Sequence, residues 1–445
     1  MTRRAHKRGR GARLLAVSLA LSSVACTGAD PSDTNDGAVR SGDPARGAGG
    51  TVAFGVVGSP ATLDPYSPLA SDLTRALVRP VYPSLYRLLP DGGTDPYLAA
   101  SATRVGRRIE VTLRRARWSD GSRIGARDVV ASARRARAPS VFAAFERVRA
   151  LGPRTVAFRG RVERPHLALA TAAFVLPRGE ARAAVSGGPF LLSSHRPGLE
   201  VTYERNPDWL GERPLLDGLS VRFVQSLRQL VALLHRGRLE AAAPPSTVNI
   251  ADVVGRRVRL REALGWETVY LDLAGFDLGS TERAAVVSSI DRSTMAATFV
   301  RSDGRVAASL PAVLGGTDAS SDRAGDGFED RIQVSAPVGD ELLELVQRAL
   351  WRQLRRAGID ADLVGIDPET FYGAWREDNP TDIALRRAAA APAFGAPAAR
   401  GESPAYPLFR VKTFIATLDG VHGPAPNPTL DGPLWNVESW WVEPG

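Results

Sequence analysis

Side chains that could do catalysis or bind a metal are few in this chain and scattered along it. Five histidines occur in 445 residues, and a single cysteine leaves no paired-cysteine site. The metalloprotease pattern His-Glu-x-x-His and the Gly-x-Ser-x-Gly turn of serine hydrolases are missing. The carboxylates have no spacing diagnostic of acid–base or metal chemistry. We therefore predict no catalytic residue, no metal site and no cofactor, and an extracellular hydrolase is the weakest function considered.

The single cysteine, Cys26, stands at the end of a secretory signal. Six basic residues and no acid precede the apolar run Leu14–Ala25, which is too short to span a membrane. The residues flanking the cysteine resemble a bacterial lipobox, in which the cysteine is lipidated and becomes the mature N-terminus. We predict that residues 1–25 are a lipoprotein signal peptide. The alternative is an ordinary cleaved signal with an incidental cysteine, and the sequence leaves the export route open.

Residues 26–50 are polar and rich in Gly, Asp and Pro, so we predict a flexible tether. The net charge of +9 suggests a nucleic-acid binder at first. Six of the excess positive charges belong to the signal segment, however, which leaves too small an excess for a nucleic-acid-binding face. No disulfide can form within the body, so its stability must come from a large core, and its length suffices for two lobes.

The stretch 108–132 predicts a strand, a turn and a helix. Apolar and polar residues alternate over residues 109–114, which puts one apolar face on a short strand. Asp120 and Gly121 form a strong turn signal, since Asp can bond its own backbone and Gly accepts a left-handed conformation. A helix is expected from Ala126 onward, with glycine in place of a polar N-cap residue.

Two strand–helix–strand units follow further along the chain. Asp340 is expected to cap the longer helix, and Gly358 to end it. Strands joined by helices in this way predict parallel sheets covered on both faces. The expected elements are strand 219–224, helix 226–235 and strand 239–242, then strand 331–338, helix 341–358 and strand 359–366.

Several ordered motifs resemble the extracytoplasmic solute-binding proteins of family 5, the substrate-binding lipoproteins of peptide and nickel ABC importers. They are Leu-Asp-Pro at residues 63–65, Trp-Ser-Asp-Gly at 118–121, Glu-Arg-Asn-Pro-Asp-Trp at 204–209, and a C-terminal pattern of Asn436, Glu438 and Trp440. The resemblance covers nearly the whole chain. It implies an α/β, two-lobed fold of the periplasmic-binding-protein type (class II, cluster C), with mixed sheets, helices on both faces and a cleft between the lobes.

The resemblance also implies a domain plan. After the signal peptide (1–25) and the tether (26–50), lobe 1 is expected over residues 51–264, with a smaller subdomain at about 66–186. Lobe 2 is expected over 265–405, and residues 406–445 return to lobe 1. The Trp-Ser-Asp-Gly turn is then scaffold of the first lobe, and specificity lies in the second.

The implied function is not enzymatic: a monomer captures a small molecule or peptide by lobe closure and delivers it to ABC permease subunits. The N-terminal lipid would hold the protein on the extracytoplasmic face of the cell membrane. The alternative is a degenerate member that acts as a cell-surface sensing or interaction protein without transport. A metal-binding role, as in nickel-binding relatives, stays open although no constellation of histidine or cysteine supports it.

One departure from the family concerns ligand charge. In peptide-binding relatives an aspartate shortly after the strand that corresponds to residues 381–385 pairs with the free amine of the peptide. Here no acid occupies the fifteen positions after Asp382, and a buried ammonium without a counter-charge is costly. Arg386 and Arg387 instead favour an anionic or neutral ligand, unless another carboxylate substitutes. The alternative is that both arginines simply face solvent.

Aromatic residues of the second lobe are the remaining ligand-binding candidates. Trp266 and Tyr270 lie where the chain crosses into lobe 2, and Trp375 follows a helix-like segment. Aromatic side chains supply contact area in binding clefts, but packing within the core is the competing role for each of them.

Overall fold

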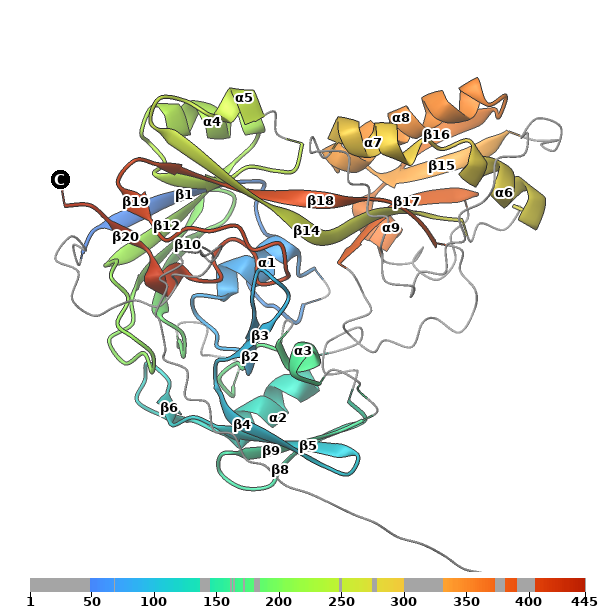
Figure 1. Ribbon diagram of the computed structural model, residues 1–445. Coiled ribbons are helices and arrows are strands. Elements are labelled where there is room, and N and C mark those ends of the chain that lie inside the picture. The colour runs from blue at the N-terminus through green and yellow to red at the C-terminus, as the bar shows by residue number, and fades with distance from the viewer. Residues whose placement is uncertain are drawn as a thin grey trace, which may run out of the picture. The chain divides into compact units, whose positions relative to one another are not determined.

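The computed structural model of the protein describes most of the chain from residue 49 onward (Figure 1). All described residues belong to one compact unit, Ala45–Gly445. Cys26, the predicted signal peptide and nearly all of the predicted tether lie outside them. None of the helices in the described ranges has the length and apolar character needed to cross a membrane. These ranges are 49–67, 69–136, 145–160, 162, 165–170, 173–179, 185–247, 250–273, 278–299, 331–372, 381–389 and 405–444.

A ten-stranded sheet forms the backbone of the fold (Figure 1). Its two central strands, β14 and β18, are long and pair antiparallel over most of their length. The strand order is β10 (Phe190–Arg196), β11 (Glu200–Arg205), β12 (Gly218–Val224), β1 (Thr51–Val57), β13 (Ala241–Ala243), β18 (Ala405–Leu418), β14 (Val258–Asp272), β17 (Ile383–Ala389), β15 (Ile332–Pro337) and β16 (Ala361–Ile366).

Both predicted strand–helix–strand units lie in this sheet with parallel neighbours. β1 pairs parallel with β12 and β13, and β15 pairs parallel with β16 and β17. The remaining pairs are antiparallel, so the sheet is mixed, as predicted. The helices of the two units are α4 (Leu227–His235) and α8 (Glu341–Arg356).

Helices cover both faces at the β15–β17 end of the sheet, as Figure 1 shows. α7 and α8 lie on one side of the strands, and α9 lies on the other. Residues at the two ends of α8 fix its start and its stop as predicted. Asp340 Oδ1 accepts the Leu343 N–H at 3.1 Å, and Gly358 has a φ of +81° just past the helix. The helices at this end are α6 (Ser280–Ser288), α7 (Arg292–Phe299), α8 and α9 (Pro368–Tyr372), whereas α5 (Ile250–Val253) lies beside α4.

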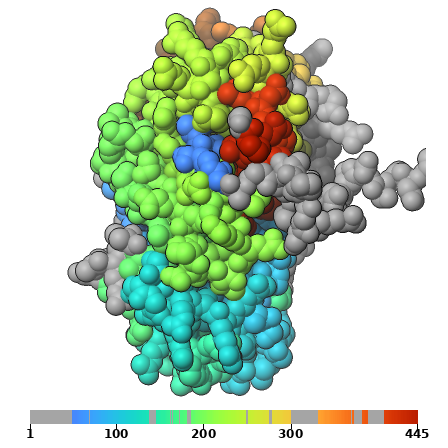
Figure 2. Space-filling view, turned by 90° about the vertical axis from the view of Figure 1, so that its left-hand side faces the viewer, coloured from blue at the N-terminus to red at the C-terminus, as the bar shows by residue number. Residues whose placement is uncertain are grey.

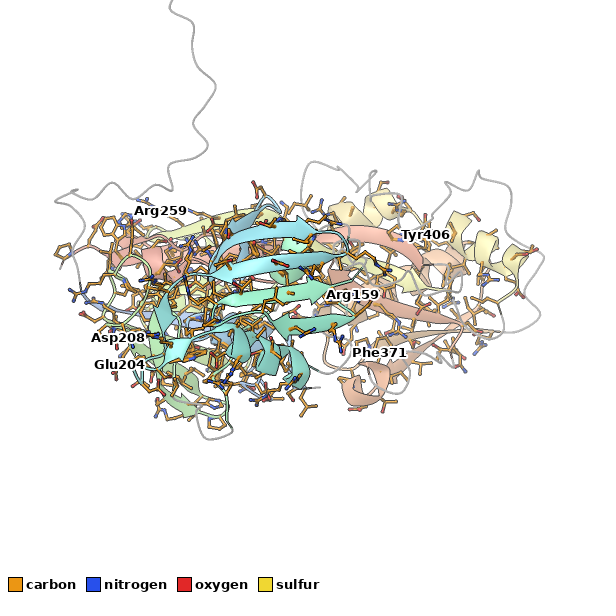
Figure 3. The ribbon with its side chains drawn as sticks, turned by 90° about the horizontal axis from the view of Figure 1, so that it is seen from below. Arg159, Glu204, Asp208, Arg259, Phe371 and Tyr406 are labelled. Atoms are coloured by element: carbon orange, nitrogen blue, oxygen red, sulfur yellow. The ribbon has the colours of Figure 1, made fainter. Side chains whose placement is uncertain are left out.

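A four-stranded antiparallel sheet lies toward the viewer in Figure 3, where Arg159 marks β9. Its order is β4 (Ala99–Val105), β5 (Arg108–Leu113), β9 (Thr155–Arg159) and β8 (Arg147–Ala150), and α2 (Ala126–Arg135) packs against it. The other elements are α1 (Asp72–Val78), α3 (Pro165–Ala170), the 3-10 turn η4 (Val437–Ser439) and the ribbons β2 (Tyr86–Leu88) with β3 (Thr94–Pro96), β6 (Ala116–Arg117) with β7 (Arg123–Ile124), and β19 (Val421–His422) with β20 (Trp441–Val442).

The Trp-Ser-Asp-Gly sequence forms the turn between β6 and β7. Gly121 has a φ of +80°, which glycine adopts without strain, and Asp120 Oδ1 accepts the Ser122 N–H at 2.9 Å. Trp118 is 1 % exposed and belongs to the main apolar core. These contacts fit the scaffold role predicted for the turn.

The apolar core has separate clusters on the two ends of the large sheet. One contains residues of β1, α2 and β9 together with Trp440 near the C-terminus, whose ring centroid lies 5.5 Å from that of Phe54. On the face in Figure 2, the first described residues in blue lie beside the C-terminal segment in red. A second cluster joins α8 to β14, β15 and β17. The lobe boundaries given above stay a prediction.

The antiparallel pair β14 and β18 contains a close backbone approach at Gly265. The register of the two strands shifts between Leu264 and Thr268. A Cβ atom at Gly265 would lie 2.0 Å from the carbonyl oxygen of Val411, a backbone atom that cannot move aside as a side chain can. This bulge redirects β14 just before the segment that meets β17.

We expect Gly265→Ala to lower the free energy of unfolding by about 1–3 kcal/mol, because the added methyl group must push two paired strands apart. Urea denaturation followed by circular dichroism measures the loss. Gly152→Ala is the matched control, since a Cβ atom there meets nothing within 4 Å. Equal stability of the two variants would contradict the close approach at residue 265.

Candidate functional site

The predicted residues Tyr270, Arg386 and Arg387 meet where β14 pairs with β17. In the antiparallel register Tyr270 lies opposite Arg386, and Val269 lies opposite Arg387. Successive residues of a strand point to opposite faces, so the two arginines lie on different faces of the sheet. They therefore do not form a single cationic site.

Arg386 is held in a buried ion pair. The residue is 7 % exposed, and its Nε donates to Asp272 Oδ2 at 3.0 Å. Its guanidinium carbon lies 5.0 Å from the ring centroid of Phe371 on α9, a cation–π distance. Phe371 is labelled in Figure 3, and Figure 1 shows its helix α9 below the strands. The alternative that Arg386 faces solvent is wrong, and its role in ligand binding stays a prediction.

Arg387 connects three elements through two carboxylates. Its Nη2 lies 2.7 Å from Asp340 Oδ2, and its Nη1 lies 3.5 Å from Glu267 Oε2. Asp340 is the N-cap residue of α8, so the same carboxylate that orders the helix start also binds the guanidinium. The Arg387 side chain is about one-third exposed. Its positive charge is therefore compensated within the chain before any ligand arrives.

The carboxyl group of Glu267, which contacts Arg387, has a raised pKa. Burial raises the pKa of its carboxyl group, Arg387 opposes that shift, and the nearby carboxylates of Asp72 and Asp340 raise the pKa further. Asp72 belongs to the first turn of α1 and pairs with Arg75 at 2.7 Å. We call Glu267, Arg387, Asp340 and Asp72 the Glu267 cluster. Because Asp72 is paired with Arg75, Glu267 and Asp340 share the single guanidinium group of Arg387, which leaves one negative charge in excess.

The other predicted site residues are Tyr270, Trp266 and Trp375, and the structure describes them to different extents. Tyr270 is partly buried and lies between Arg386 of β17 and Pro407 of β18. The backbone of Trp266 belongs to β14, at the register shift, but its side chain lies outside the described residues, as does the whole of Trp375. Sequence reasoning missed Glu267 and the second role of Asp340, since no local signal brings residue 267 beside residue 387.

No group of three or more His, Cys, Asp or Glu side chains in the described ranges is arranged to hold a metal ion. The contacts that surround the Glu267 cluster are ion pairs and hydrogen bonds between carboxylates, guanidinium groups and the start of α8. The cluster can bind and orient a charged group.

The raised pKa of Glu267 predicts a pH-dependent difference between the native chain and Glu267→Gln. A group whose folded-state pKa lies above its unfolded value of about 4.3 stabilises the protein below that value. This contribution is lost as the pH rises through the folded-state pKa. We therefore expect the native chain to lose stability relative to Glu267→Gln as the pH rises above about 4, as measured by urea unfolding. A difference independent of pH would contradict the raised pKa.

Comparison with solved structures shows what the fold resembles. The oligopeptide-binding protein AppA from Bacillus subtilis, solved with a nonapeptide, is 16% identical with a TM-score of 0.71, covering 90% of this chain and 100% of its own. The agropinic acid complex of AgaA from A. tumefaciens R10 is 19% identical with a TM-score of 0.71, covering 89% and 99%. NikZ from Campylobacter jejuni with Ni(L-His) is 14% identical with a TM-score of 0.67, covering 88% and 99%.

A comparison with curated proteins found no match to this chain. The sequence profile of the bacterial extracellular solute-binding proteins, family 5, middle region, matches residues 94–398, which is more than half of the chain. The mixed sheet, the helices on its two faces and the solved structures agree with the two-lobed α/β fold that the motifs imply. The chain therefore belongs to the bacterial extracellular solute-binding proteins of family 5.

Proposed function

We propose that this protein is a lipid-anchored solute-binding subunit that captures a peptide or peptide-like solute by lobe closure and delivers it to an ABC importer. Membership of family 5 supports the binding role. The signal segment that ends at Cys26 supports an anchor on the extracytoplasmic face of the membrane. Charged groups near the meeting point of two lobes are suited to orient a solute as the lobes close.

The proposed ligand class is based on the charges of the Glu267 cluster. No acid occupies the fifteen positions after Asp382, which begin with β17. Glu267 of the neighbouring strand β14, however, lies beside Arg387 of β17. A solute ammonium near Glu267 would relieve the repulsion that Asp72 and Asp340 impose on its carboxylate. Glu267 is a candidate for the substitute carboxylate that the sequence left open, and we base the proposed ligand charge on it. The solute that we propose has a free amine.

The ligands of the three structural relatives differ too much to choose a solute for this chain. A nonapeptide, agropinic acid and a nickel–histidine complex are bound by proteins of similar fold. The local charges, rather than the fold, are therefore the basis of the proposal.

A second candidate function is a cell-surface sensing or interaction protein that no longer serves a transporter. The observation in its favour is that Arg386 and Arg387 each bind a carboxylate of the chain itself. A protein that has lost its ligand would be expected to pair its cleft arginines with its own carboxylates in this way.

Native mass spectrometry of the gently purified protein tests the proposal. We expect a co-purified small molecule, and micromolar binding of a set of short peptides by calorimetry that is lost on acetylation of their amino groups. A protein that is empty on purification and binds neither free-amine nor acetylated peptides would favour the interaction role. Binding that is unchanged by acetylation would reject the free-amine ligand.

A further inference from the structure

A pocket of about 500 Å³ lies between α8 and the edge strand β16. Four arginine side chains line it, from Arg331, Arg348, Arg352 and Arg355, against only two carboxylates. None of these residues belongs to the Glu267 cluster. The pocket is therefore a separate, strongly basic feature, and the inference drawn from it does not depend on the proposed function.

The helix geometry explains why three of the four guanidinium groups gather. Arg348, Arg352 and Arg355 are spaced by four and three residues, so they occupy one face of α8 and are all exposed. Arg331, just before β15, pairs with Asp362 at 3.3 Å. Within the described part of the chain no ion pair joins the three α8 arginines to a carboxylate. The pocket therefore keeps an excess of positive charge, since its four guanidinium groups outnumber the carboxylates of Asp360 and Asp362.

Trp351 gives the pocket a fixed apolar wall. Its Nε1 donates to the carbonyl oxygen of Ala361 at 2.9 Å, which holds the indole against β16. The Arg355 guanidinium carbon lies 4.8 Å from the centroid of the indole ring. Leu363, which is 40 % exposed, lines the same pocket. Guanidinium groups held beside a rigid ring lose less conformational freedom when they bind a ligand.

The helix dipole explains only part of this pattern. Arginines in the last turn of a helix are favoured by its negative end, which accounts for Arg355 and Arg356. Arg348 lies two turns earlier, and Arg331 comes from outside the helix. Their convergence on one pocket needs another explanation.

We propose that this pocket binds a phosphate group, in either a soluble phosphate ester or the headgroup of an anionic phospholipid. Guanidinium groups bind phosphate through paired hydrogen bonds, and phosphate offers more acceptor oxygens than carboxylate to several converging arginines. The apolar wall would contact the organic part attached to that phosphate. The phosphate site lies on the α8–β16 edge and adds to the solute site rather than replacing it.

Calorimetry with inorganic pyrophosphate at low ionic strength tests the site, using the full chain with Cys26→Ser so that no lipid is attached. Flotation with vesicles of phosphatidylglycerol against phosphatidylcholine tests the lipid source in parallel. We expect Arg352→Ala to weaken binding about tenfold, as for the loss of one charge-assisted hydrogen bond. Arg356→Ala is the matched control on the same helix, because Arg356 does not line the pocket.

Each outcome bears on the proposal. Pyrophosphate binding that Arg352→Ala weakens supports a soluble phosphate ester, and binding only to phosphatidylglycerol vesicles with the same sensitivity supports a lipid headgroup. Thermal unfolding checks that Arg352→Ala is folded, and Arg348→Ala serves as the second variant. The proposal is overturned if millimolar pyrophosphate and both vesicle types fail to bind, or if Arg356→Ala weakens binding as much as Arg352→Ala does.

Discussion

Replacing Arg79 with alanine is expected to lower the free energy of unfolding by about 3–5 kcal/mol, because it leaves a buried carboxylate without its counter-charge. The side chains of Arg79 and Asp431 are 2% and 0% exposed, and they form an ion pair. Asp431 Oδ2 also accepts the Leu88 N–H at 2.9 Å, and Arg79 Nη1 donates to Ser84 Oγ at 2.6 Å. This network connects the end of α1 to the C-terminal segment.

The matched control for this prediction is Arg75→Ala on the same helix. Arg75 pairs with Asp72 at 2.7 Å, but the Asp72 side chain is 66% exposed, so its loss should cost only about 0.2–1 kcal/mol. Urea unfolding of both variants gives the comparison. Burial raises the pKa of Asp431 and Arg79 opposes that shift, so the loss in Arg79→Ala should be smaller at acid pH, where Asp431 is protonated. Similar losses in both variants would contradict the prediction.

Elements with local signals could be predicted from the sequence. The helix after Asp340 begins at Glu341 and ends at Arg356 as its cap and stop residues indicate. The helix after the Trp-Ser-Asp-Gly turn begins at Ala126 despite its glycine N-cap. Its start is held instead by Asp128, whose Oδ2 accepts the Gly125 N–H at 2.7 Å. In both cases neighbouring residues satisfy the first backbone groups of the helix, and that information is local.

Contacts between distant segments could not be predicted in the same way. Arg79 and Asp431 are 352 residues apart, and nothing in either neighbourhood indicates the other. Glu267 and Arg387 meet only because β14 and β17 pair in one particular antiparallel register. A shift of that register by one residue would move Glu267 to the opposite face of the sheet. A smaller error concerns the buried face of α8. The helical spacing of its apolar residues predicts that Leu345 is buried, but Leu345 is only partly buried, whereas Leu343 and Gln347 are buried.

The register of β14 and β17 places Glu267 beside Arg387, and we expect its substitution to have the largest effect on solute binding. We expect Glu267→Gln to weaken the binding of a free-amine peptide by about 30-fold or more, because truncating one partner of a desolvated charge pair costs 2 kcal/mol or more. The same peptide after acetylation should bind neither the native chain nor Glu267→Gln. Isothermal titration calorimetry at neutral pH measures both affinities, with the free-amine peptide found in the first screen.

Glu204→Gln is the control, because Glu204 is an exposed carboxylate on β11 of the same sheet (Figure 3). It removes the same charge without touching the Glu267 cluster. Since the pKa of Glu267 is raised, acidification should also weaken binding by the native chain, through protonation of the carboxylate that accepts the amine. Glu267→Gln should have no such dependence. If Glu267→Gln and Glu204→Gln bind the peptide equally well, the amine is held by another carboxylate and the Glu267 cluster is a structural ion-pair network.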